Sequence, residues 1–542
     1  MSLNTVAFPS GASGPSMGSK TLSLENILPP PSSSARITSS VSASFNLLAT
    51  VIGGGVLSLP FAYAASGLVL TTVFVLLAAC MGSFSLYILC SCARRTGGVT
   101  YGDVVRRAFG PRAELGLQLT LATFLLFVVT AYMVLIRDIN GSLVPLFVDP
   151  APAPNQVLAA SMVFCLPFML QRDLHSLRYN CYVGFVSVLL LLVAIVARSL
   201  TVNVFEPTPE YPKPWDRVRS ESILWTSSLN DALFSFPLVA LAFLSQFNML
   251  AVHASLANPT RARVLAVINR AILCCTVVFS LFGSAGYLYA LGDTRDNILL
   301  NFRPDDPVIL LGKVGLGLAL MSGISMILLP CRDAILLIPS KWASSCGSEH
   351  SYARIPSETT PLHSNNSNPP QPAYLLNPPL DPTFTSFIDD EPDDDYNNNR
   401  ARNLSEESLA SNEELPPSST PAHVTSTLAI AGICYFAATS VPGVSTVWSI
   451  CGSSLGIIIA YILPSLCYLK IRSRKAMNVR LVGAWMLLVV SVFLMIVCTA
   501  QAVGRLMGGP IQTKASDLTD DYDDDLVRDD GLDDIAGGGG GR

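Results

Sequence analysis

The sequence predicts an all-α polytopic membrane protein with about eleven transmembrane helices. Half of the 542 residues are hydrophobic and only 13% are charged, whereas a soluble chain carries about 25% charged residues. The apolar residues fall into repeated runs close to the ~20 residues that a helix needs to cross a bilayer. Lysine and arginine gather in alternate loops, as expected for the cytoplasmic side. Together, these three patterns indicate lipid as the solvent of the fold.

The apolar runs divide the chain into five segments. We expect a disordered cytoplasmic tail at 1–38, helices one to eight within 39–337, and a disordered loop at 338–424 that is rich in Pro, Ser, Asn and Asp. Helices nine to eleven follow within 425–504, and an acidic tail occupies 505–542. The candidate spans run near 39–63, 66–92, 116–137, 156–171, 179–200, 231–256, 266–291, 308–331, 425–441, 444–469 and 480–504.

Four basic loops give the predicted topology. They follow the second, fourth, sixth and tenth spans, so all four fall on one side of the membrane. The positive-inside rule makes that side and the N-terminus cytoplasmic. The 338–424 loop is then cytoplasmic too, while the acidic tail is extracellular or lumenal. The basic residues are Arg94, Arg95, Arg106, Arg107, Arg112, Arg172, Arg178, Arg261, Arg263, Lys470, Arg472, Arg474, Lys475 and Arg480.

Composition also excludes several classes of protein. The net charge of −5 and the lack of a large basic cluster argue against nucleic-acid binding. Most of the 13 cysteines lie inside apolar runs without a Cys-x-x-Cys motif, so we expect packing cysteines rather than disulfides or zinc ligands. No Walker loop, His-x-x-x-His pair or Gly-x-Ser-x-Gly motif is present, so the chain is not expected to be an enzyme or a primary pump.

The first span contains three successive glycines, Gly53, Gly54 and Gly55, in the middle of its apolar run. Each glycine weakens a helix by about 1 kcal/mol relative to alanine. We expect the helix to unwind here, because half-helix N-termini inside a membrane favour anionic substrate groups. The alternative is close packing of helices against small residues.

The sixth span is broken in a similar way by Ser245, Gln246 and Asn248. Polar side chains at this depth are costly unless they are paired. Five spans lie before this one, so the two breaks hold matching positions in a five-plus-five inverted repeat. Such a repeat places the first and sixth helices together at a substrate site. The alternative role of Gln246 and Asn248 is hydrogen bonding between helices.

Few ionisable residues fall within the spans. His253 lies just beyond the sixth-span break, where it could titrate near neutral pH or sit at the membrane interface. Lys313 begins the eighth span, and Arg137 and Asp138 end the third. None of the acidic residues is predicted to be a buried proton carrier. Asn140 starts a glycosylation sequon on the predicted outer side.

Five segments resemble the amino acid/auxin permease family, especially its neutral amino-acid branch. The first, at 44–62, contains Gly-Gly-Gly-Val-Leu-Ser-Leu-Pro-Phe, and the third, at 242–256, contains Leu-Ser-Gln-Phe-Asn. The order and spacing of the segments carry the resemblance, which covers most of 39–504 apart from the long loop. The segments are 44–62, 166–177, 242–256, 286–301 and 329–332.

The resemblance implies amino-acid substrates, a five-plus-five inverted repeat and coupling to sodium or protons. It assigns the substrate carboxylate to the amides of the three glycines and places residues near Ser245 around the rest of the pocket. Ala49 and Gly323 stand where sodium-coupled members carry Asn and Thr, so a coupling ion would use other groups. The candidate substrate residues are Thr50, Gly53, Gly54, Gly55, Ser245, Gln246 and Asn248, and the candidate ion residues are Thr50, Ser322 and Ser325.

These observations predict a secondary active transporter of amino acids that works by alternating access. Its expected partners are the amino-acid substrate and the lipid bilayer, with no cofactor beyond a coupling sodium ion or proton. The alternative is an amino-acid sensor that signals through 338–424. The sequence leaves open whether the chain lies in the plasma membrane or in a vacuolar or lysosomal membrane.

Overall fold

The computed structural model describes residues 38–150, 152–170, 180–205, 213–303, 306–347, 420–473 and 477–508. The chain divides into one unit that contains residues up to Ile338 and from Glu414 onward, and a second unit, Pro339–Glu413. The predicted tails, 1–38 and 505–542, and the predicted loop, 338–424, lie for the most part outside the described residues. The basic loop after the fourth span, with Arg172 and Arg178, also lies outside them.

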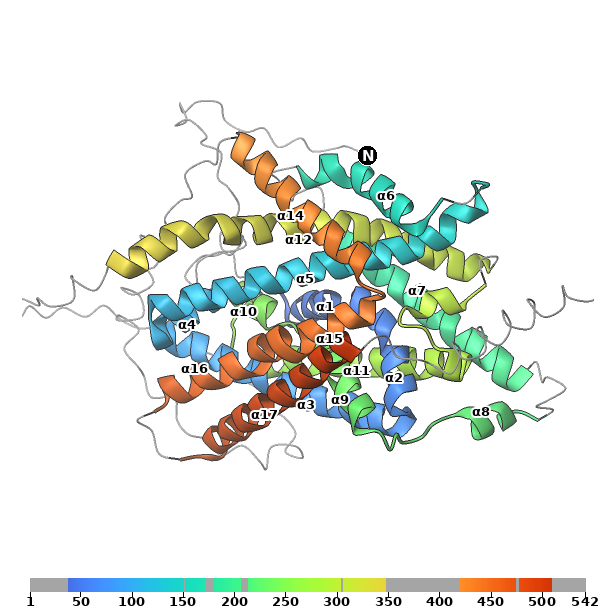
Figure 1. The fold of residues 1–542 in the computed structure, drawn as a ribbon. Coiled ribbons are helices and arrows are strands. Elements are labelled where there is room, and N and C mark those ends of the chain that lie inside the picture. Colours follow the sequence, from blue (N-terminus) through green and yellow to red (C-terminus); the bar gives the residue numbers. More distant parts are fainter. Residues whose placement is uncertain are drawn as a thin grey trace, which may run out of the picture. The chain divides into compact units, whose positions relative to one another are not determined.

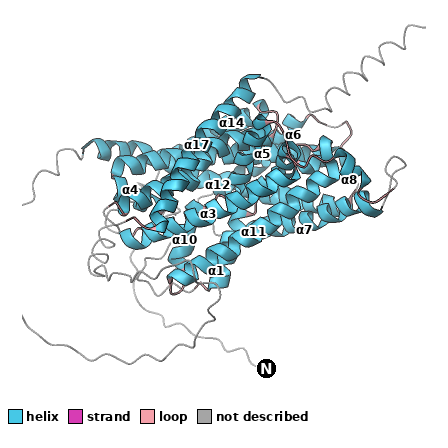
Figure 2. Ribbon diagram, turned by 90° about the horizontal axis from the view of Figure 1, so that it is seen from below, coloured by secondary structure: helices cyan, strands magenta, loops and turns pink. Residues whose placement is uncertain are grey.

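The described residues form helices joined by loops (Figures 1 and 2), and their one β-type pairing is a bridge between Thr38 and Leu256. The first half of the chain contains α1 (Ser40–Val51), η2 (Gly54–Ser58), α2 (Leu59–Ser66), α3 (Leu68–Thr96), α4 (Tyr101–Phe109), α5 (Pro111–Leu143), η3 (Val144–Leu146), α6 (Pro154–Met169), α7 (Asn180–Leu200), η5 (Thr201–Phe205) and α8 (Asp216–Glu221).

The second half continues the same pattern. It contains α9 (Leu229–Ala242), α10 (Gln246–Ser255), α11 (Arg261–Ala290), η6 (Leu291–Asp293), η7 (Ile298–Asn301), α12 (Pro307–Gly347), α14 (Thr420–Ser440), α15 (Val444–Cys451), η9 (Gly452–Gly456), η10 (Ile458–Ile462), α16 (Leu463–Ile471) and α17 (Val479–Gly508). In Figure 1 the long helices α3, α5 and α11 run across the view in broadly similar directions.

Every predicted span coincides with a helix or a helix pair among the described residues. Eight helices are long and apolar enough to cross a membrane, and the bent pair formed by α1 with η2 and α2 brings the number to nine. The fourth span, α6, has 16 residues, so it is short for a membrane crossing, as its sequence indicated. The ninth, α14, has 21 residues and is not among the nine. The predicted class, an all-α polytopic membrane protein, is confirmed.

The first span is interrupted where the glycines predict. The α-helix ends at Val51, Gly53 is extended, and a 3₁₀ turn from Gly54 leads into α2. The two halves bend by 51° at this point. Hydrogen bonding within a continuous helix is therefore lost near the middle of the span, and protein groups or a bound molecule must replace it.

The sixth span is also interrupted, but the break begins two residues before the predicted segment 245–248 and shares only Ser245 with it. Helix α9 ends at Ala242 and α10 begins at Gln246, so residues 243–245 separate them. Gln246 and Asn248 therefore belong to the first turn of α10 rather than to the break. The two interrupted spans are the first and the sixth, as the five-plus-five arrangement requires.

The second half of the broken first span packs tightly on α11. A Cβ atom on Gly286 would lie 2.6 Å from Cγ of Pro60 and 3.3 Å from Cγ1 of Ile298. Tyr63 and Tyr287 are almost fully buried beside this contact, and the Tyr287 hydroxyl accepts a hydrogen bond of 2.7 Å from the amide of Ile223. Close contact at glycine is a common way to join helices where lipid gives little driving force.

Tyr87, near the end of α3, is contacted by arginines from the basic loops at one end of the helices. The guanidinium carbon of Arg261, at the start of α11, lies 5.8 Å from the ring centroid, and Arg261 Nε donates to the hydroxyl over 2.8 Å. Arg480, at the start of α17, lies 5.9 Å from the same ring. Loops after the second, sixth and tenth spans thus share one side, as their charges predicted.

Most cysteines pack as expected. Cys90, Cys165, Cys275, Cys451 and Cys498 are buried and free, and burial is typical of this residue. The prediction was wrong for Cys80 and Cys274, which are exposed on the outside of α3 and α11.

We expect Gly286→Ala to lower the melting temperature of the purified protein, because the new methyl group overlaps Pro60 in a packed interface. Gly432→Ala in α14 is the matched control, since a Cβ there meets nothing within 4 Å. Alanine also has the higher helix propensity, so the control should melt at or above the wild-type temperature. Melting can be followed by tryptophan fluorescence in detergent, and equal melting of the two variants would contradict the packing argument.

Candidate functional site

A hydrogen bond joins the two interrupted spans. Asn248 Nδ2, in the first turn of α10, donates to Thr50 Oγ1 near the end of α1 over 2.6 Å. The Thr50 hydroxyl donates its own proton to the Asn46 carbonyl over 2.8 Å, so it is free to act as the acceptor. Two candidate residues that are 198 positions apart in the sequence are therefore in direct contact. This bridge defines the centre of the candidate site.

Helix starts lie on both sides of this bridge. Helix η2 begins at Gly54 and α10 begins at Gln246, and the first amides of a helix have no acceptor within it. Their partial positive charge favours a carboxylate. Ser245 and Gln246 are fully buried. The Ser245 amide donates to Gln246 Oε1 over 3.0 Å, and Gln246 Nε2 has no partner among the described residues.

The three glycines differ in their surroundings. Gly54 is buried between α5 and α12, where a Cβ atom would lie 2.9 Å from Leu135 Cδ1 and 3.3 Å from Leu320 Cδ2. A Cβ atom on Gly53 would meet only the Tyr132 hydroxyl, at 3.8 Å, and one on Gly55 would meet nothing within 4 Å. Gly54 therefore allows the break to pack closely against α5 and α12, whereas the backbone at Gly55 borders open space.

The site includes residues of α15 that no sequence pattern singled out. Ser58 Oγ, Trp448 Nε1 and Ser449 Oγ are buried without a partner among the described residues. Helix α15, which carries Trp448 and Ser449, contacts η2 beside the first break. Buried polar atoms are normally satisfied, so these atoms mark positions where water or a bound molecule would complete the hydrogen bonding. Nothing in the serine content of the tenth span signalled this, because serine is common in membrane helices.

The candidate ion residues, Thr50, Ser322 and Ser325, have different surroundings in the part of the chain that the structure describes. The Thr50 hydroxyl is engaged with Asn46 and Asn248, and Ser322 Oγ donates to the Leu318 carbonyl over 2.8 Å. Ser325 is buried, and its hydroxyl has no partner among the described residues. No group of three or more His, Cys, Asp or Glu that could hold a metal ion occurs in the part of the chain that the structure describes.

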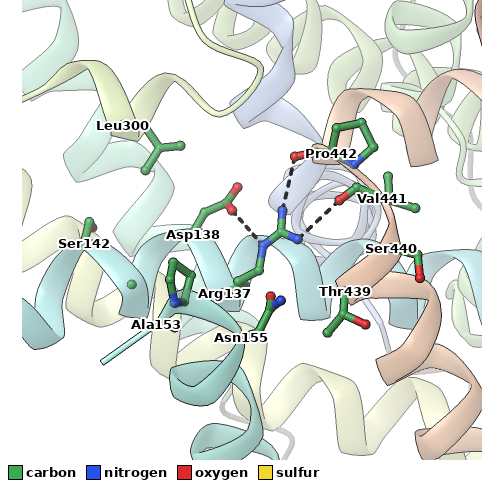
Figure 3. Close-up of a pocket in the computed structure, with 12 residues that line it drawn as sticks. Arg137, Asp138, Ser142, Ala153, Asn155, Leu300, Thr439, Ser440, Val441 and Pro442 are labelled. Carbon is green, nitrogen blue, oxygen red and sulfur yellow. Dashed lines mark hydrogen bonds and ion pairs between the residues drawn. The ribbon is translucent and has the colours of Figure 1, made fainter. Parts of the chain in front are cut away.

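A second polar cluster lies at the far end of α5 from the basic loops (Figure 3). Arg137 and Asp138 line a cavity of about 670 Å³ together with residues of α6 and of the link between α14 and α15. The side chain of Arg137 is 12% exposed and that of Asp138 is 10% exposed. The sequence did not single out Asp138 as a buried acid, whereas its side chain is largely buried in the structure. Sequence alone placed Asp138 at a helix end, where solvent was expected.

The structure also places three other residues that the sequence singled out. His253 is 9% exposed in α10, and both of its predicted roles stay predictions. Asn140 lies within α5, and its side-chain amide donates to Ser161 Oγ over 2.9 Å. The sequon therefore begins inside a helix, with its asparagine side chain in contact with α6, and glycosylation of Asn140 stays a prediction. Lys313, which the sequence placed near the start of the eighth span, is 3% exposed within α12.

Fold and site define a polytopic helical membrane protein whose first and sixth spans are interrupted at a shared polar bridge. The chain belongs to the family described as transmembrane amino acid transporter protein, which matches residues 36–503. The family is one of transporters and not of enzymes. The resemblance drawn from the five sequence segments is therefore confirmed.

Individual relatives are also named as amino acid transporters. Vacuolar amino acid transporter 7 of Saccharomyces cerevisiae is 24% identical over 305 residues, 55% of this chain and 59% of the yeast protein. The Bos taurus protein named "Putative sodium-coupled neutral amino acid transporter 11" is 25% identical over 287 residues, 52% of this chain and 59% of its own length. This chain thus spans less than two thirds of the length of either relative.

Solved structures of low similarity were also found. A nucleobase-cation-symport-1 family transporter aligns with a TM-score of 0.48 and 11% identity over 88% of this chain and 94% of its own. A Na⁺-coupled sialic acid symporter aligns with a TM-score of 0.47 and 12% identity over 86% of this chain and 90% of its own.

We expect Thr50→Val and Asn248→Leu each to lower the stability of the protein, and the double variant to lose less than the sum of the two. The coupling should be about 1 kcal/mol, as for one buried hydrogen bond between side chains. Thr123→Val is the control, because the Thr123 hydroxyl contacts only the Leu119 carbonyl of its own helix. The free energies can be compared by chemical unfolding in detergent. Strict additivity would show that the bridge does not hold the two breaks together.

Proposed function

We propose that this protein is a secondary active transporter of neutral amino acids, coupled to a proton or to sodium, and that it works by alternating access. The observation that carries the proposal is the Thr50–Asn248 bridge between two interrupted helices in a chain of the amino acid transporter family. A substrate bound at this bridge lies between two half-helices that can tilt relative to the rest of the fold, which is how such sites are exposed to each side in turn.

The substrate carboxylate would bind at the first amides of η2, from Gly54, while the polar atoms of Gln246, Trp448 and Ser449 are available for the rest of the molecule. Among the described residues, no acidic or basic side chain hydrogen-bonds to the Thr50 or Asn248 side chain, which favours substrates whose own charges balance. The names of the yeast and bovine relatives support amino acids, and the bovine name supports neutral ones.

The distribution of charge supports an orientation of the chain in the membrane, and the relatives support a choice of cellular membrane. The grouping of basic residues around Tyr87 supports a cytoplasmic N-terminus under the positive-inside rule. The segments 1–38 and 338–424 would then be cytoplasmic and 505–542 extracellular or lumenal. A vacuolar or lysosomal membrane is supported by the yeast relative, and a plasma membrane by sodium coupling in the bovine one. The ion residues would be Thr50, Ser322 and Ser325.

Reconstitution tests the function directly. The purified full-length protein in liposomes should exchange external tritiated alanine, glutamine or leucine for the same amino acid loaded inside, with no ion gradient imposed. It should also accumulate at least one of them when either a pH gradient or a sodium gradient is applied. If no amino acid is exchanged or accumulated while the protein remains folded in the liposomes, transport is not its function.

Gln246→Met should abolish amino-acid exchange and lower stability by no more than about 1 kcal/mol, the worth of the hydrogen bond that Gln246 Oε1 accepts from the Ser245 amide. The side chain keeps its length, and the wild-type amide nitrogen has no partner among the described residues. Gln118→Met in α5 is the matched control, since Gln118 Oε1 is another buried polar atom without a recorded partner but lies in a different span. The control should exchange amino acids normally. Normal exchange by Gln246→Met would place the substrate elsewhere.

A further inference from the structure

Arg137 ties the end of α5 to the link between α14 and α15. Its Nη1 donates to the carbonyls of Ala438 and Val441 over 2.9 and 3.2 Å, and its Nη2 donates to that of Pro442 over 3.3 Å. Nε lies 3.4 Å from Asp138 Oδ1. Figure 3 shows the guanidinium between the Asp138 carboxylate and the carbonyls of the link. One cation therefore caps the end of α14 and pairs with the neighbouring acid.

Asp296 binds the other side of the same link. It precedes η7, and its Oδ2 accepts a hydrogen bond of 3.4 Å from the Ser445 amide at the start of α15. Its Oδ1 accepts one of 2.9 Å from the Asn297 amide. Gly443 leaves room for the carboxylate, because a Cβ atom there would overlap Oδ2. The carboxylate thus acts as the cap of the helix that contacts the first break.

Asn297 connects the two acids. Its backbone amide donates to Asp296, and its side-chain amide donates to Asp138 Oδ2 over 3.5 Å. The Asp138 and Asp296 carboxyls are thus joined through Asn297, and Asp138 also pairs with the Arg137 guanidinium. With both acids ionised the cluster carries a net charge of −1, and with one proton bound it is neutral. A partly buried cluster favours the neutral state, because desolvation penalises net charge.

The other charged groups nearby do not change this balance. Asp293 and Arg295, on the same connection as Asp296, are exposed and of opposite charge. The facing parts of α14, α15 and α6 contribute carbonyls, amides and Asn155 but no ionised side chain. Burial raises the pKa of the Asp296 carboxyl, and the amides of Ser445, Asn297 and Val444 oppose that rise without cancelling it. Asp296 consequently takes up a proton at a higher pH than an exposed aspartate would.

The cluster is connected to the candidate substrate site through two elements. Helix η7 begins directly after Asn297 and contacts η2, which forms part of the broken first span. Helix α15, which Asp296 caps, contacts η2 as well. Any loosening of the cluster therefore acts on both supports of the first break.

We propose that Arg137, Asp138 and Asp296 form a lock between α5, α14 and α15 that binds one proton and opens when the proton is bound. The inference rests on the proposed transport function and names a proton site for it. A neutral carboxyl is a weaker acceptor than a carboxylate, so protonation weakens the hold on the α15 amides or on Arg137. The adjoining cavity gives water a route to Asp138. The carboxylate oxygens that accept N–H groups leave few free for a bound cation.

The lock can be tested without transport. Ser445→Cys is a conservative reporter, since Ser445 is 7% exposed beneath Asp296. We expect its labelling by a membrane-impermeant maleimide, counted above that of the unsubstituted protein, to be slow near pH 8 and to rise as the pH falls toward roughly pH 5. The change must exceed that of an exposed reference thiol, because thiolate reactivity itself falls on acidification.

Substituting the acids should remove this pH dependence. Asp296→Asn and Asp138→Asn each make the cluster neutral, so the thiol introduced by Ser445→Cys should be labelled rapidly at both pH values. Asp293→Asn is the matched control on the same exposed connection and should behave as the wild type. Two results would overturn the proposal. One is a labelling rate that does not depend on pH when both acids are intact, and the other is labelling that stays slow in both acid variants.

Transport separates failure of the lock from failure of the function. In liposomes, Asp138→Asn and Asp296→Asn should lose accumulation driven by a pH gradient yet keep exchange of tritiated amino acid, while Asp293→Asn should keep both. Absence of exchange by the wild type would refute the transport function. Exchange by the wild type, with gradient-driven accumulation intact in both acid variants or driven only by sodium, would refute the proton site alone.

Discussion

Backbone groups cannot remain unpaired in hydrocarbon, and this constraint governs the rest of the structure. Continuous helices meet it by themselves, and most of the described chain is continuous helix. The first and sixth spans do not, since α1 ends at Val51 and α9 ends at Ala242 well inside their apolar runs. Each interruption is stable only where neighbouring groups replace the missing bonds. The Thr50–Asn248 contact lets the two interruptions support one another, which is why they lie side by side.

The same constraint explains which features of the structure could be predicted from the sequence. Span positions follow from hydropathy, because nearly every apolar run must become a helix, and the three glycines mark the first break directly. The second break was placed too late. Polar residues in an apolar run need hydrogen-bond partners, but they do not show where the helix unwinds. Gln246 and Asn248 lie in the first turn of α10 and not in the break itself. Asp138 and Asp296 could not be paired from sequence, since 158 positions of chain separate them and only the folded α5, η7 and α15 bring them to one link (from 138 to 296).

Charge is distributed differently at the two ends of the helices. Arg261 and Arg480 lie beside the aromatic ring of Tyr87, and no carboxylate contacts that ring among the described residues. Such cation–π contacts suit a part of the protein that does not move. At the opposite end, arginines pair with acids of other helices or of the connections beside them. Arg505 Nη2 lies 2.6 Å from Asp231 Oδ1 between α17 and α9, and Arg198 Nε in α7 lies 2.6 Å from Oδ2 of Asp306, which precedes α12. Ion pairs between different helices can be broken and remade as the helices move, whereas stacked cations mainly anchor them.

Gly443 shows how closely the Asp296 carboxylate is held against the start of α15. The residue is extended, with φ of −162°, so its backbone does not require glycine. Glycine is needed there because the Asp296 carboxylate occupies the space of a side chain. A carboxylate held that closely against a helix start stabilises the cap while it is charged and loses that advantage when neutral. Because α15 and η7 both contact η2, the state of one carboxyl group reaches the glycines of the first break through direct contacts.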